Sequence, residues 1–216
     1  DAAGLKVGNS TSAIYGYRWA GVNPQDGVEQ FYDNNGVLRT ASEINALPIS
    51  STLVLADRLP DFQGGFINNI TIYDFNLSFN ILYSYGASIM VNYIDEADGR
   101  NLQNRNQSVN LLDRWQRPGD ITDIPRLLIN RTIVANSSRY LYDASYLKLS
   151  NVSLAYKLPK ELSSKLHLNN VNIIANATNL LYLYKDAGTK GRNGVAEKRF
   201  VYPESSAFTF GVRLGF

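Results

Sequence analysis

The stretch FNLSFNILYSY, from Phe75 to Tyr85, alternates apolar and polar residues with a period of two. Successive side chains of a β-strand point to opposite faces of its sheet, so this stretch predicts a strand with one apolar and one largely polar face. The apolar positions are Phe75, Leu77, Phe79, Ile81, Tyr83 and Tyr85. The polar positions between them include Asn76, Ser78 and Asn80.

The final stretch, FTFGVRLGF, repeats this pattern from Phe208 to Phe216. Its apolar positions are Phe208, Phe210, Val212, Leu214 and Phe216, and they alternate with Thr209, Gly211, Arg213 and Gly215. Four further strands are expected at 11–21, 62–73, 146–158 and 170–181. Within 146–158 the apolar residues change phase near Ser150, which predicts a β-bulge there.

The links between these strands alternate in length. The turn at Tyr73-Asp74 is very tight and the link at 158–169 is moderate, whereas those at about 22–60, 88–142 and 183–205 are long. Short periplasmic turns and long external loops are typical of outer-membrane barrels, which begin at about 8 strands. The sequence therefore predicts an all-β fold, an antiparallel transmembrane β-barrel segment of about six strands that pairs with strands outside this chain.

The composition argues against several functional classes. The chain has no cysteine and one histidine, His167, so thiolate metal sites, histidine-based triads and most zinc sites are not expected. The net charge of +2 gives no electrostatic reason to expect a nucleic-acid partner. We therefore expect no catalytic residues, no metal site and no cofactor, and we do not expect the chain to be an enzyme.

Several stretches, taken in order, resemble the SusC/RagA family of TonB-linked outer-membrane proteins from Bacteroidetes-type bacteria. They are AIYGYRWAGVNP at 13–24, LPDFQGGF at 59–66, YDFNLSF at 73–79, RWQRPGD at 114–120 with DIPR at 123–126, ASYLKLSNVSLAYKLP at 144–159, ATNLL at 177–181 and the terminal strand. Their order and spacing are similar to about the last quarter of a family member, and the resemblance covers nearly the whole chain.

The resemblance implies that residues 1–216 are the C-terminal part of a TonB-dependent receptor barrel with 22 strands. The plug and the N-terminal extension of the family have no counterpart in this stretch. Family members import glycans or peptides across the cell outer membrane beneath a SusD-like surface lipoprotein, with energy from TonB. The implied partners are the N-terminal remainder of the barrel with its plug, the SusD-like lipoprotein, the TonB complex through a segment outside this chain, and outer-membrane lipid.

Within such a barrel the two faces of the strands have different surroundings. The side chains expected to face lipid are Phe75, Leu77, Phe79, Ile81, Tyr83, Phe208, Phe210, Val212 and Leu214. Those expected to face the lumen are Asn76, Ser78, Asn80, Thr209 and Arg213. Phe216 is the terminal aromatic residue that the family uses as a signal for barrel assembly.

Four residues of an expected external loop are candidates for substrate binding: Trp115, Arg117, Asp120 and Arg126. Aromatic rings stack on sugars, and guanidinium groups bind oxygens in pairs. The alternative is that they scaffold the loop, because Pro118-Gly119-Asp120 is a turn signal.

The sequence is also compatible with two other functions. Alternation alone also permits a soluble all-β glycan-binding or adhesin module. The chain could also be a structural part of a split pore, with no transport role of its own. The substrate is not readable from the sequence.

Overall fold

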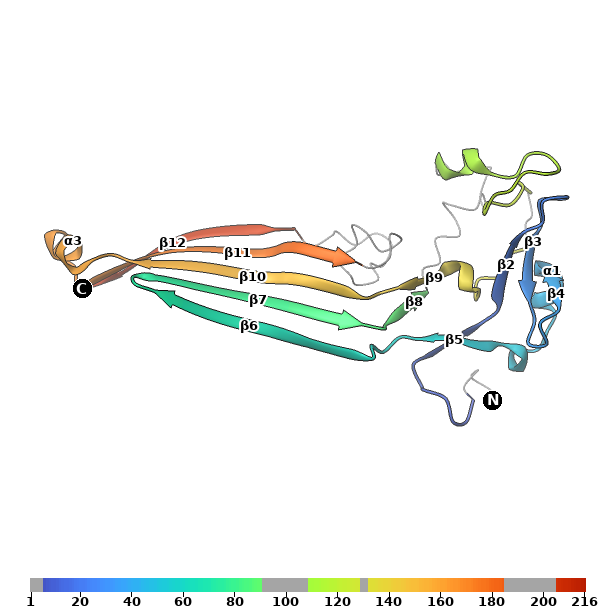
Figure 1. Cartoon of the computed structure of the whole chain (residues 1–216), viewed down its shortest axis with the longest axis horizontal. Coiled ribbons are helices and arrows are strands. Elements are labelled where there is room, and N and C mark those ends of the chain that lie inside the picture. The colour runs from blue at the N-terminus through green and yellow to red at the C-terminus, as the bar shows by residue number, and fades with distance from the viewer. Residues whose placement is uncertain (1–5, 91–108, 129–131, 185–204) are drawn as a thin grey trace. The chain divides into compact units, whose positions relative to one another are not determined.

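The computed structural model of the chain describes residues 6–90, 109–128, 132–184 and 205–216 (Figure 1). The chain divides into two compact units. We call the first, Asp1–Leu59 with Ser88–Tyr142, the loop unit, and the second, Pro60–Ala87 with Asp143–Phe216, the sheet unit. Among the described residues, no helix combines the length and the apolar character that crossing a membrane demands.

The sheet unit is built on one antiparallel sheet of five strands in the order β12-β11-β10-β7-β6 (Figure 1). Its strands are β6 (Phe62–Ile72), β7 (Phe75–Tyr85), β10 (Tyr146–Lys157), β11 (Asn170–Tyr184) and β12 (Ala207–Gly215). The sequence predicts each of these five strands to within a few residues, and strands adjacent in the chain lie side by side in the sheet. The link predicted at 183–205 lies mostly outside the described residues.

The predicted bulge in β10 is present at Ser150. Leu149 pairs with Ile81 of β7, whereas Asn151 pairs with Asn80, so Ser150 is the extra residue on its strand. Its Oγ donates a hydrogen bond of 3.1 Å to the backbone oxygen of Asn80. The bulge changes the phase of β10 once, and this places Leu149 on the same face as the apolar residues that follow it.

The irregularity continues into β11. Leu149 pairs with Leu181 and Asn151 pairs with Thr178, so β11 has one residue more than β10 across this interval. Asn179 lies in the interval with a φ of 55°, a left-handed conformation that asparagine adopts more readily than most residues. The two irregularities together keep the apolar residues on either side of them on one face of the sheet.

The two short links of the sheet unit are well-defined turns. Tyr73 and Asp74 form the two-residue turn between β6 and β7, and Tyr73 has a φ of 53°, as primed hairpin turns require. Helix α3 (Lys160–Lys165) occupies the other link. After its last residue, Lys165, His167 has a φ of 59° and its backbone nitrogen donates to the Ser164 oxygen at 3.0 Å, as in a Schellman motif. His167 thus terminates a helix in this structure.

In the part that the structure describes, the loop unit contains three small sheets and a short helix. Its paired strands are β1 (Ala13–Gly16) with β5 (Leu53–Asp57), β2 (Arg18–Val22) with β3 (Glu29–Tyr32) and β4 (Leu38–Thr40), and β8 (Ser88–Met90) with β9 (Leu141–Asp143). The helical elements among its described residues are α1 (Ala41–Asn45) and the 3₁₀ turns η1 (Ile49–Ser51), η2 (Val109–Asp113) and η3 (Ser138–Tyr140).

The strand expected at 11–21 differs from the prediction. It is divided at Tyr17 into β1 and β2, which lie in different sheets, and neither joins the five-stranded sheet. Tyr17 is buried and instead donates its backbone N–H to the Asn136 oxygen at 2.8 Å. Its ring packs in a local core with Phe31, Ala41, Ile44 and Val134. Burial in or against this small core, rather than alternation between two surfaces, accounts for Tyr17 and Trp19 of this stretch.

The bulge can be tested by removing Ser150. We expect deletion of Ser150 to reduce strongly the amount of folded protein, because residues 146–149 would move to the wrong face of β10. Ser150→Ala is the matched control, since it keeps the bulge and loses only the Oγ hydrogen bond, worth about 1 kcal/mol. The readout is the fraction of the whole protein containing this chain that runs in its compact, folded form on an unheated gel. Equal folded fractions for the deletion and the unaltered protein would contradict the role given to the bulge.

Candidate functional site

One face of the sheet unit carries apolar side chains on all five strands, with Asn68, opposite Phe79, as a polar residue on it. Residues paired across antiparallel strands share a face, so the register assembles rows of neighbouring side chains. One row consists of Ile72, Phe75, Tyr156, Ile173 and Val212, and the next consists of Ile70, Leu77, Leu154, Ala175 and Phe210. Every residue expected to face lipid lies on this face, and the bulge adds Leu147 and Leu149 to it.

The side chains of this apolar face are largely exposed. Phe208 is 66% exposed, Phe210 is 79% exposed and Val212 is 63% exposed, although each belongs to a well-paired strand. Soluble monomers rarely expose a contiguous apolar patch larger than a few hundred Å². Such a face needs an apolar environment to cover it.

Aromatic pairs lie at both ends of the apolar face. Phe75 and Tyr156 have ring centroids 4.5 Å apart near the Tyr73-Asp74 turn. At the opposite ends of β6 and β7, the rings of Phe62 and Tyr85 are stacked 5.1 Å apart.

The opposite face is largely polar, and small side chains dominate it. One row crosses all five strands with a polar residue at each position: Asn69, Ser78, Ser153, Asn176 and Thr209. Asn76 and Asn80 lie in the rows on either side, and the amide of Asn76 donates to Thr71 Oγ1 at 3.0 Å. The five residues expected to face the lumen, Arg213 included, therefore share one face.

Both outer strands of the five-stranded sheet have a free edge in the described part of the chain. β12 pairs only with β11 and β6 pairs only with β7. Long edge strands with few charges invite further pairing, and β12 carries a single charged residue, Arg213. The sheet therefore has the form of an open segment whose edges suit additional strands.

Trp115, the first candidate of the loop unit, joins the segment 109–128 to the turn between β2 and β3. Its indole Nε1 donates to the Pro24 oxygen at 2.9 Å. Its ring lies against Gly27, where a Cβ would come within 2.5 Å of the ring and where φ is +69°. Gly119 and Arg126 add backbone hydrogen bonds to Pro24 and Gly27, of 2.8 and 3.0 Å. The segment that carries the candidates is thus docked on the turn between β2 and β3.

Asp120 organises the turn in which it lies. Its Oδ2 accepts backbone N–H groups from Gln116 and Arg117, each at 3.0 Å. These bonds, with that from Gln116 foremost, lower the pKa of Asp120 below its ordinary value. The Arg117 side chain is 86% exposed, and its Nε lies 3.4 Å from Asp120 Oδ1. These contacts favour the scaffold interpretation for Asp120.

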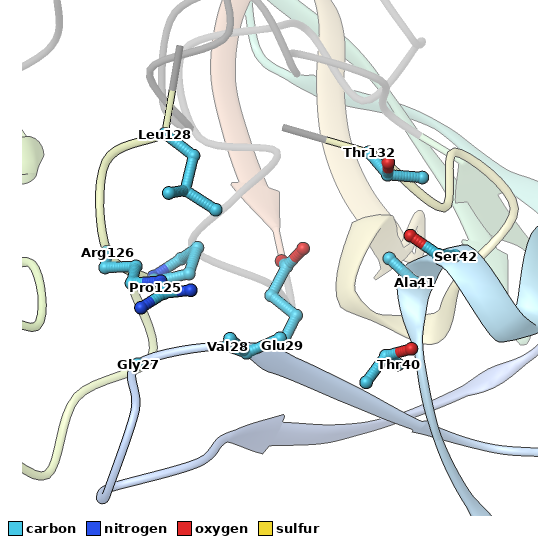
Figure 2. A pocket seen from close by; sticks show the side chains of 10 residues that line it. All are labelled: Gly27, Val28, Glu29, Thr40, Ala41, Ser42, Pro125, Arg126, Leu128 and Thr132. Atoms are coloured by element: carbon cyan, nitrogen blue, oxygen red, sulfur yellow. The ribbon is translucent and has the colours of Figure 1, made fainter. Parts of the chain in front are cut away.

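Arg126 differs from the other three candidates because it lines a cavity. The cavity lies within the loop unit and has a volume of about 300 Å³. Figure 2 shows Pro125, Arg126 and Leu128 on one side of it, Thr40, Ala41, Ser42 and Thr132 on the other, and Glu29 between them. The Nε atom of Arg126 is buried and has no hydrogen-bond partner among the described residues.

A buried ion pair supports this cavity from within the loop unit. Glu29 and Arg139 form a salt bridge, and their side chains are only 4% and 11% exposed. Arg139 also donates to the Asp123 oxygen at 2.9 Å and lies over the Trp19 ring at 5.3 Å. Sequence reasoning missed this pair, because the two residues are 110 positions apart and neither lies in a recognisable motif.

Comparison with known proteins matches the chain to TonB-dependent receptors of Formosa agariphila. TonB-dependent receptor P3 is 27% identical over 241 residues, which cover 98% of this chain and 23% of that receptor. TonB-dependent receptor P39 is 28% identical over 154 residues, covering 69% and 14%. TonB-dependent receptor P26 is 26% identical over 212 residues, covering 88% and 20%. The chain spans less than a quarter of the length of these relatives, and no protein-family model matches it.

Solved structures of similar fold include two of the RagAB system. The RagAB peptide importer in the open-open state matches with a TM-score of 0.78 at 23% identity, over 98% of this chain and 24% of that one. The RagAB peptide transporter matches with a TM-score of 0.77 at 23% identity, over 94% of this chain and 23% of that one. Together these matches confirm the predicted fold, the resemblance to TonB-linked receptors and the outer-membrane location. The relatives are receptors and transporters, which agrees with the expectation of no enzymatic activity.

The docking of residues 109–128 on Gly27 can be tested by substituting this glycine. We expect Gly27→Ala to loosen residues 109–128, because the new methyl group adds a clash with Trp115 to the cost of a positive φ. Gly36→Ala is the matched control: its φ is +77° but its Cβ would meet open space, so only a backbone cost of roughly 1–2 kcal/mol applies. Hydrogen exchange of residues 109–128 in the whole protein is the measurement. Equal protection in the two variants would contradict this docking.

Proposed function

We propose that this chain, which is similar to TonB-dependent receptors over nearly its whole length, forms barrel wall and external loops of a TonB-dependent outer-membrane importer. The observation that carries the proposal is the continuous, exposed apolar face of the sheet unit, backed by a face of small polar residues. Lipid on one side and water on the other are the two surroundings that this pattern fits.

The length of the strands supports a membrane-spanning role. At about 3.3 Å per residue, the 11 residues of β7 extend over roughly 36 Å. A tilt of about 45° reduces this to roughly 26 Å along the membrane normal, close to the apolar band of about 25 Å in outer-membrane barrels. The aromatic pairs at the two ends of the apolar face then occupy the positions of interfacial girdles.

In this proposal the two faces keep the roles expected from the sequence. The apolar face, from Phe75 on β7 to Leu214 on β12, contacts lipid. The polar face, with Asn76, Ser78, Asn80, Thr209 and Arg213, lines a watery lumen or contacts a plug. Small side chains on this face leave room for either.

The free edges of β6 and β12 support the view that residues 1–216 are one part of a larger barrel, the C-terminal part by resemblance. Full closure would pair both edges with strands from the remainder of the receptor, which would also supply the plug and the segment that contacts TonB. Phe216, which is 90% exposed after the end of β12, suits a signal for the assembly machinery.

The proposed mechanism is import through a plugged pore powered by TonB. Long loops, including the loop unit, take part in capturing a glycan or peptide, together with a SusD-like lipoprotein above the barrel. Of the four loop candidates, Arg126 is favoured for contact with substrate because it lines a cavity, while Trp115, Arg117 and Asp120 contribute by shaping the loop. A soluble glycan-binding module is disfavoured, because it would leave the apolar face of the sheet unit in water.

Paired arginine substitutions on β12 test the proposal. Phe210→Arg places a charge near the middle of the proposed lipid face, at a cost of about 2–4 kcal/mol. Thr209→Arg, one residue earlier, places the same charge on the proposed lumen face and is the matched control. We expect the first variant to lower the amount of folded receptor in the outer-membrane fraction several-fold and the second to leave it near the unaltered level. The reverse order would overturn the assignment of the two faces.

A further inference from the structure

We propose that the cavity beside Arg126 binds the terminal carboxylate of a short peptide. This rests on the proposed function, because it names the chemical group that a capture loop of the importer would recognise. All the described residues that line the cavity belong to the loop unit.

The guanidinium group of Arg126 supplies the positive charge. Its Nε is buried and has no hydrogen-bond partner among the described residues, which is costly for a charged donor. The backbone N–H of Arg126 donates a hydrogen bond of 3.0 Å to the Gly27 oxygen. This bond fixes the position of the Arg126 backbone in the wall of the cavity. A ligand carboxylate pairs well with a guanidinium group, because its two oxygens match the planar fork of arginine.

The charge balance of the cavity favours an anion. Glu29 also lines it, but the negative charge of Glu29 is engaged in the buried salt bridge with Arg139. Arg126 therefore leaves one net positive charge among these three groups. A ligand cation would meet repulsion from Arg126 without gaining an unengaged carboxylate.

The remaining walls indicate what accompanies the carboxylate. Val28, Ala41 and Leu128 supply apolar surface, and Ser42 and Thr132 supply hydroxyl groups (Figure 2). Among the described residues that line the cavity none is aromatic, so they offer no ring surface of the kind on which sugars usually stack. A volume of about 300 Å³ is small for a ligand pocket. It suits one or two terminal residues with small aliphatic side chains, and this favours a peptide end over a uronic acid.

The test uses the whole receptor that contains this chain, purified in detergent, with binding measured by calorimetry. The probes are N-acetyl-Ala-Ala with a free carboxylate, the same dipeptide as its C-terminal amide, and D-glucuronate. We expect the free acid to bind at least about tenfold more tightly than the amide, as loss of a charge-assisted bidentate contact implies. We expect glucuronate to bind weakly.

Arginine substitutions show whether Arg126 is responsible for binding of the free acid. Arg126→Gln should weaken binding of the free acid about tenfold or more, and Arg126→Lys should weaken it less, because the charge remains without the fork. Arg18→Gln is the matched control, since Arg18 is exposed on β2 and lies outside the cavity. It should leave the affinity unchanged.

Equal binding of the acid and the amide, or an unchanged affinity in Arg126→Gln, would overturn the proposal. Arg126-dependent binding of glucuronate in preference to the dipeptide would overturn the assignment to peptides. Binding in detergent requires neither TonB nor a membrane. This result and the test of the two faces on β12 can therefore fail independently of each other.

Discussion

Backbone pairing in a fixed register is the constraint on which the rest of this structure depends. An antiparallel sheet places paired residues on the same face, so a slip by one residue would exchange every apolar side chain with a polar one. Inside a membrane the same backbone groups have no water to bind, and they must all be paired within the protein. The bulge at Ser150 and the left-handed Asn179 meet both demands, because they adjust the phase of two neighbouring strands without ending the pairing.

The loop unit is stabilised by different interactions. A small core around Phe31 and Ile44 fixes its three-stranded sheet, and the buried pair Glu29–Arg139 joins segments that are distant in the sequence. The docking of Trp115 on Gly27 fixes the segment that carries Arg126 against the turn between β2 and β3. As a result, Arg126 lies on the wall of a defined cavity although it comes from a long connection between strands of the five-stranded sheet.

The sequence predicts the sheet unit well, because its strands are governed by a local pattern. The boundaries of β7 and the phase change at Ser150 follow directly from alternation. The stretch 11–21 shows the limit of this reasoning, since an apolar residue such as Tyr17 looks the same whether it faces lipid or a small core. The cavity and the Glu29–Arg139 pair were beyond prediction, because they depend on which distant loops meet. Arg126 could be named from its residue type, but its cavity could not.

The central claim is that one face of the sheet unit meets lipid and the other meets water. The most direct measurement is photolabelling of the whole protein in its native membrane with a lipid-soluble probe, read residue by residue along β7. The account predicts labelling at Phe75, Leu77 and Phe79, with Asn76, Ser78 and Asn80 unlabelled. Labelling of the second set in place of the first, or of neither set, would contradict it.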